Sequence, residues 1–151
     1  MLSNTLTYRQ YITEILSREY VFIITDNLYT YKFEDNTELR LRFYKLQDKV
    51  IGTVYRIDFS ITNENGKENF NSGSTNKNPI TVYDITFSGI RQFLHTNPTI
   101  DYIMFTAEKD EQSRVKFYNR MTKNFHKYIK NFELFDTKET STDISYYLEK
   151  Q

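Results

Sequence analysis

Apolar and polar positions alternate along several stretches of the chain, and this alternation predicts strands. Within residues 38–46, Leu39, Leu41 and Phe43 point to one side while Arg40 and Arg42 point to the other. In residues 50–61 the shared apolar face is formed by Tyr55, Ile57, Phe59 and Ile61. Further strands are expected at residues 20–25 and 28–34, which flank an Asp26-Asn27 turn, and at 100–107, 133–135 and 144–148.

Three other stretches repeat apolar residues every three to four positions, which predicts helices at residues 5–17, 81–95 and 111–131. Their order with the strands, α-β-β-β-β-α-β-α-β, indicates an α+β fold with a single mixed, mostly antiparallel sheet and packed helices. Residues 100–107 are apolar on both faces, so we expect this strand at the centre of the sheet, covered by helices. The length of 151 residues suits one domain, residues 1–151.

A polar loop is expected at residues 62–79, where the sequence TNENGKENFNSGSTNKNP is dominated by Asn, Ser and Gly. Phe70 is its one large apolar residue and could anchor the loop to the body of the domain. Loops of this length are usually functional or mobile, and a mobile surface loop is the simpler interpretation.

The predicted helix at 111–131 carries a row of cations. At about 100° per residue, five basic side chains fall within a stripe of about 80°: Lys116, Arg120, Lys123, Lys127 and Lys130. With Arg114 they make six basic residues and no acid between positions 114 and 130. The row is either a solvated helix face or a contact for a polyanion such as nucleic acid, since cations in line can follow a phosphate backbone.

Several kinds of chemistry are excluded or disfavoured. The chain has no cysteine, which excludes disulfides and thiolate chemistry. His95 and His126 fit no metal-binding pattern, so no metal is expected, and no glycine-rich phosphate loop or G-x-S-x-G elbow is present. No cofactor is therefore expected. The formal net charge is zero, so binding of a polyanion would require a local patch.

The sequence also lacks signals for export or membrane insertion. Its longest apolar run, residues 20–24, is far shorter than the roughly 20 residues of a membrane span. The first residues contain no apolar core of a signal peptide. No membrane partner is expected, and the expected location is the cytoplasm of a host cell or a virion.

Three segments resemble small uncharacterised proteins of tailed bacteriophages and related viruses. They are VYRIDF at 54–59, ITFSGIRQFLHTNP at 85–98 and IDYIMFTAEKDEQSRVKFYNRM at 100–121, which includes Ser113, Arg114 and Tyr118. The resemblance covers about half of the chain, and the family's long loop differs from the one here. It implies a viral origin, and a protein of the virion or host as partner.

The order strand, helix, strand, helix in the second half also resembles the GNAT superfamily of N-acetyltransferases. That resemblance implies an acetyltransferase-like fold and makes Tyr118, on the final helix, a candidate general acid. The superfamily's pyrophosphate loop, R/Q-x-x-G-x-G/A, would follow Phe59 and is absent here. The sequence therefore favours a non-catalytic viral accessory or virion-associated binding protein. The alternatives are an acyl-CoA-dependent N-acyltransferase with a degenerate loop and a nucleic-acid-associated protein that uses the basic helix.

Overall fold

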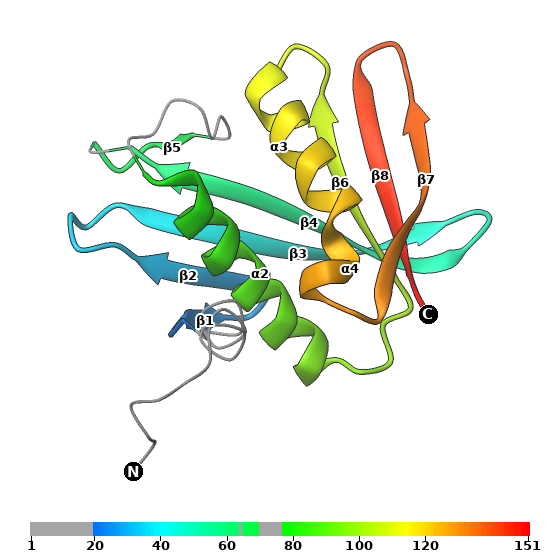
Figure 1. The fold of residues 1–151 in the computed structure, drawn as a ribbon, viewed down its shortest axis with the longest axis horizontal. Helices are drawn as coiled ribbons and strands as arrows, with labels where there is room; N and C mark the ends of the chain where they lie inside the picture. The colour runs from blue at the N-terminus through cyan, green and yellow to red at the C-terminus, as the bar shows by residue number, and fades with distance from the viewer. Residues whose placement is uncertain (1–19, 64, 70–76) are drawn as a thin grey trace, which may run out of the picture.

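The computed structural model describes residues 20–63, 65–69 and 77–151 as one mixed sheet with helices packed against it (Figure 1). Its strands are β1 (Ile23–Thr25), β2 (Leu28–Lys32), β3 (Glu38–Asp48), β4 (Gly52–Thr62), β5 (Glu68–Asn69), β6 (Tyr102–Glu108), β7 (Phe132–Glu139) and β8 (Asp143–Lys150). Its helices are α2 (Pro79–Thr96), α3 (Gln112–Lys123) and α4 (Phe125–Tyr128). The predicted α+β class is confirmed. The predicted helix at 5–17 lies outside the described residues.

The strands follow the order β1-β2-β3-β4-β6-β8-β7, and β5 pairs with the end of β4. Among the described strands, β4 and β6 run parallel and the other pairs are antiparallel, as the mixed, mostly antiparallel prediction requires. The parallel pairing is short, because it joins only Tyr55 to Ile103 and Arg56 to Met104. Beyond these residues the two strands diverge (Figure 1).

Alternation in β3 and β4 sets which face of the sheet is buried. Leu39, Leu41 and Phe43 pair with Ile61, Phe59 and Ile57 across the two strands, and all six side chains are buried. Figure 1 shows α2, α3 and α4 lying over one face of the sheet. Buried aromatic residues, among them Phe43, Phe59, Phe87, Phe93 and Phe105, fill much of the core between that face and the helices.

β4 begins later than the alternation predicts. The Asp48 carboxylate accepts hydrogen bonds from the backbone N–H groups of Val50 and Ile51, at 2.8 and 3.1 Å, and closes a turn. Gly52 follows with a φ of 84°, a conformation that glycine adopts without strain. Val50, predicted to lie in the strand, is consequently 84% exposed at the tip of the hairpin.

Helix α2 starts two residues before the predicted boundary. The Asn78 side chain accepts a hydrogen bond from the Ile80 N–H at 2.9 Å, and Pro79 occupies the first helical turn, where its missing N–H has no cost. The helix lies close to the sheet at Gly89, where a Cβ atom would come within 2.5 Å of Leu41 Cδ1. A larger residue at Gly89 would push α2 away from β3.

The predicted helix at 111–131 is wrong in its length, because it divides into α3 and α4 at Asn124. The Asn124 side chain donates to the Arg120 carbonyl at 2.9 Å, and its backbone N–H bonds the same carbonyl at 3.3 Å. Asparagine often ends helices because its amide competes for backbone partners. The chain then turns at residues 129–131 and enters β7, which is much longer than the predicted strand at 133–135.

Strand β6 lies between β4 and β8, so its predicted central position is confirmed. The expected cover of helices on both faces is wrong for the described residues. Ile103, Phe105 and Ala107 are buried under the helices, whereas on the other face Met104 is 8% exposed and its neighbours Tyr102 and Thr106 are only half-buried. Thr106 instead shares a hydrogen bond of 3.0 Å with Ser145 of the neighbouring β8.

The predicted loop at 62–79 begins with ordered structure. Gly66, with a φ of 78°, turns the chain so that β5 pairs with Ile61 and Thr62 of β4. Phe70, the proposed anchor, lies outside the described residues.

Candidate binding site

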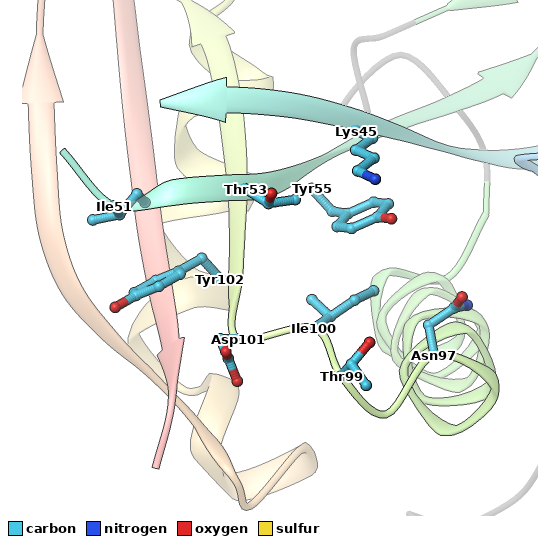
Figure 2. Close-up of a pocket in the computed structure, with 9 residues that line it drawn as sticks. All are labelled: Lys45, Ile51, Thr53, Tyr55, Asn97, Thr99, Ile100, Asp101 and Tyr102. Carbon is cyan, nitrogen blue, oxygen red and sulfur yellow. The ribbon is translucent and has the colours of Figure 1, made fainter. Parts of the chain in front are cut away.

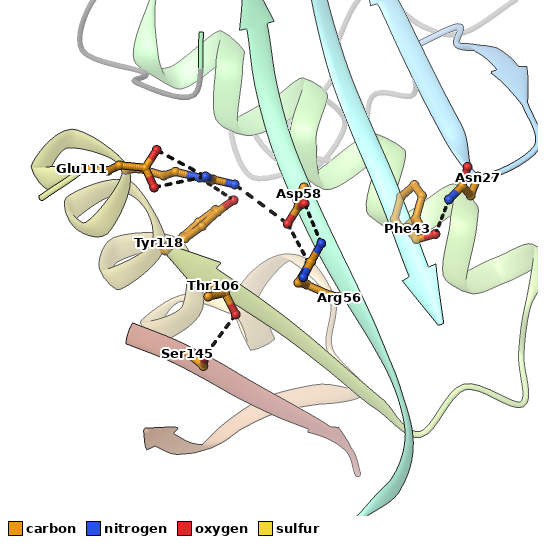
Figure 3. Close-up of polar contacts among 9 residues, drawn as sticks. Asn27, Phe43, Arg56, Asp58, Thr106, Glu111, Tyr118 and Ser145 are labelled. Atoms are coloured by element: carbon orange, nitrogen blue, oxygen red, sulfur yellow. Dashed lines mark hydrogen bonds and ion pairs between the residues drawn. The ribbon is translucent and has the colours of Figure 1, made fainter. Parts of the chain in front are cut away.

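The space between β4 and β6 is filled by two side chains of α3. Tyr118 is completely buried, and Figure 3 shows it pointing from α3 toward β4. Its hydroxyl accepts a hydrogen bond from Arg114 Nε at 3.2 Å. Burial raises the pKa of the Tyr118 phenol above its ordinary value, so the phenol stays neutral at pH 7.

Arg114 links this tyrosine to two carboxylates. The guanidinium lies 3.3 Å from a Glu111 carboxylate oxygen on its own helix and 3.9 Å from Asp58 on β4. Asp58 also pairs with Arg56, at 3.2 Å (Figure 3). Arg114 is only 8% exposed. Arg114 was predicted among the polyanion-binding residues, but its charge is turned inward and paired with carboxylates.

The burial of Tyr118 decides whether it can act as a general acid. A general acid must come within about 3 Å of the group that it protonates. The Tyr118 hydroxyl is enclosed by Arg114 and the core, and the side chain has 0% exposure. In this conformation it cannot meet a substrate.

The remaining predicted cations lie on the outer side of α3 and α4. Lys116, Arg120, Lys123, Lys127 and Lys130 are all exposed, and together they are called the basic stripe below. No member of the basic stripe forms an ion pair within the described part of the chain. The structure thus confirms that the row is exposed and unneutralised across the break at Asn124.

Beside the basic stripe lies a groove between α2 and α3, called the α2–α3 groove. It consists of two hollows of about 230 and 220 Å³ that share Pro79, Tyr83 and Arg120. Lys116 and Lys77 border the first hollow, and Phe87 and Tyr128 line the second. Burial raises the pKa of the Tyr83 phenol, and the positive charge of nearby Arg120 opposes part of this rise.

A larger hollow, of about 440 Å³, lies where β4 and β6 begin (Figure 2). Figure 2 shows Lys45 and Thr53 on one side of it and Asp101 and Thr99 on the other. Its charged side chains are one cation, Lys45, and one acid, Asp101. This lining has no cluster of like charges and no histidine, so it provides neither a polyanion site nor a metal site.

The two histidines lie on different helices, α2 and α4. His95 and His126 are both exposed, and no group of metal-ligating side chains occurs among the described residues. No helix within the described ranges is long and apolar enough to cross a membrane.

Comparison with family models, with curated proteins and with solved structures finds no match for this chain. The phage and acetyltransferase resemblances therefore gain no support from these comparisons.

Sequence reasoning found the basic stripe but missed the groove beside it. Tyr83, on α2, lies 33 to 37 positions before Lys116 and Arg120, so no local pattern connects them. The available signal was a pair of aromatic residues four positions apart on the predicted helix at 81–95, Tyr83 and Phe87.

Proposed function

We propose that this chain is a non-catalytic binding protein that holds the phosphate backbone of a nucleic acid on its basic stripe. The observation that carries the proposal is the set of five exposed cations without an ion-pair partner in the described residues. Solvated helix faces usually interleave acids three or four residues from their cations, which stabilises the helix. This face has none, so its charges are available to a phosphate chain.

The filled space between β4 and β6 supports a non-catalytic role. An acyl-CoA-dependent transferase would need room for the acyl group beside an accessible acid or base. Here Tyr118 and Arg114 occupy the space, and their polar atoms contact each other and Asp58 of the strand. We further propose, from the phage resemblance, that the protein acts as a viral accessory or virion-associated factor.

The test is fluorescence anisotropy with labelled oligonucleotides at several salt concentrations. We expect binding at about 50 mM salt, with log K falling by about 0.7 per phosphate contact for each unit of log salt on a single strand. Lys123→Gln with Lys127→Gln should weaken binding and flatten this slope. Sequence preference should hardly change, because contacts to phosphate carry little sequence information.

A matched control removes two charges elsewhere. Lys32 and Lys49 are exposed and have no ion-pair partner in the described part of the chain, so Lys32→Gln with Lys49→Gln changes the net charge equally. This variant should bind like the unmodified protein. Equal weakening by both variants, or no binding at about 50 mM salt, where phosphate contacts are strongest, would overturn the proposal.

A further inference from the structure

The α2–α3 groove has an aromatic floor. Five rings lie nearly parallel in one continuous series, with interplanar angles between 13° and 18°. Successive centroids are 4.8, 4.8, 6.3 and 4.4 Å apart along the order Phe59, Phe117, Tyr83, Phe87, Tyr128. Phe59, Phe117 and Phe87 are buried, and the half-buried Tyr83 and Tyr128 bring the series to the surface of the groove.

Three cations border the groove, and one acid, Asp84, lines the second hollow. Arg120 lines both hollows, and Lys116 lines the first, so two members of the basic stripe also border the groove. Lys77 stands at the other edge, where it pairs with Asp35 and lies 4.5 Å from the centre of the Phe33 ring. The groove thus combines planar apolar surface with cations that belong to the proposed phosphate track.

Its size limits what can enter. Each hollow is smaller than the pockets of roughly 300 Å³ or more that enclose drug-sized ligands and cofactors. A single planar ring suits this space better than a whole cofactor. The bases of a single strand are free to leave the chain axis, whereas those of a duplex are paired and stacked inside it.

We infer that the α2–α3 groove takes a base of a single-stranded nucleic acid, which lies against Tyr83 while Lys116 and Arg120 hold the flanking phosphates. This inference rests on the proposed function, since the basic stripe supplies the phosphate contacts. Aromatic surface beside a cationic track is the usual arrangement in proteins that bind single strands without sequence preference. The ligand is therefore a single strand, and the protein has little or no preference for its base sequence.

The test compares three probes of equal length, about 12 nucleotides, within the range of single-strand sites. They are oligo-dT, the same sugar-phosphate chain without bases, and a duplex. Oligo-dT should bind at least about fivefold more tightly than the abasic chain, the gain that stacking of one base provides. It should also bind more tightly than the duplex at the same salt concentration.

Variants locate the base. Tyr83→Leu should bring oligo-dT down to the affinity of the abasic chain and leave the abasic chain unaffected. Tyr44→Leu is the matched control, because Tyr44 is a half-buried tyrosine on the sheet beside Arg56, away from the groove. It should change neither affinity. If Tyr83→Leu does not fold, the comparison of the three probes on the unmodified protein still tests whether the groove takes a base.

The outcomes separate the two proposals. Equal binding of oligo-dT and the abasic chain would overturn the base site and leave the phosphate track standing. Binding of neither probe would overturn both. Displacement of oligo-dT by oligo-glutamate at equal charge concentration would place an acidic polypeptide in the groove and overturn the inference.

Discussion

Basic residues on the inner and outer faces of α3 and α4 differ in their exposure and in their partners. On the inner face Arg114 is 8% exposed and contacts Tyr118, Glu111 and Asp58. On the outer face Arg120, six residues later, is exposed and has no acidic partner in the described part of the chain. The first arginine holds the helix against a gap in the sheet, and the second is available to a ligand.

The helical period explains this difference. At about 100° per residue, Arg114 and Tyr118 lie about 40° apart around α3, while Arg120 lies about 120° from Arg114. A run of basic residues in a sequence therefore combines side chains with unlike roles. Angular position, rather than proximity in the sequence, decides which of them can meet a partner.

The largest effect is expected at the centre of the inner face. Phe125 is completely buried and lies 5.4 Å from the Phe87 ring and 6.2 Å from the Phe105 ring. Phe125→Ala should lower the free energy of unfolding by about 3–5 kcal/mol, because it leaves a cavity. Denaturant titration measures this loss, and a shift below about 1 kcal/mol, far under that range, would show that the inner face is not packed as described.

Arg114→Ala should have the next largest effect on stability. Removal of the guanidinium leaves Asp58 and Glu111 without their shared cation and opens the space beside Tyr118. Loss of one partner of a buried pair costs about 3–5 kcal/mol, and partial solvation of the two carboxylates should reduce this to about 2–3 kcal/mol. Nucleic-acid binding by the folded fraction should not change, and a loss of binding without a loss of stability would assign Arg114 to the outer face.

A smaller effect, confined to acid, is expected from the pair at the edge of the groove. The Lys77 ammonium, with hydrogen bonds from Thr37, lowers the pKa of Asp35 to about 2. A lowered carboxyl pKa stabilises the folded state above the ordinary value near 4, and this contribution is lost as the pH falls toward about 2. Between about pH 4 and about pH 2, the melting temperature of Asp35→Asn should therefore fall less steeply than that of the unmodified protein. If the melting temperature falls equally steeply with decreasing pH in both proteins, the pair does not stabilise the fold.

The smallest effect on stability is expected for Arg120→Ala. Exposed side chains without partners usually change the free energy of unfolding by less than about 0.5 kcal/mol. The same change should weaken oligo-dT binding and reduce the salt slope by about 0.7, the value of one single-strand phosphate contact. Lys49→Ala is the control on the distant hairpin, and equal binding by both variants would remove Arg120 from the ligand site.

Local patterns predicted much of the fold. Alternation placed Leu39, Leu41 and Phe43 in the core, and two-sided apolarity placed β6 at the centre of the sheet. Boundaries set by single polar side chains were missed. Asp48 closes a turn before β4, and Asn124 divides the last helix, and neither hydrogen bond follows from periodicity.

The candidate site was predicted in part, for a related reason. The basic stripe is a property of one helix, so its spacing is visible in the sequence. The α2–α3 groove depends on how α2 packs beside α3, which brings Tyr83 next to Arg120. The filling of the space between β4 and β6 likewise depends on a tertiary contact, from Arg114 to Asp58.

The most direct test of the account is a nuclear magnetic resonance titration of the ¹⁵N-labelled protein with oligo-dT at low salt. The account predicts shifts of the amide signals along the outer face, at Lys116, Arg120, Lys123 and Lys127, and at Tyr83 in the groove. The signals of Arg114, Tyr118 and Phe59 should stay in place. Shifts confined to the space between β4 and β6, or no shifts at all, would contradict it.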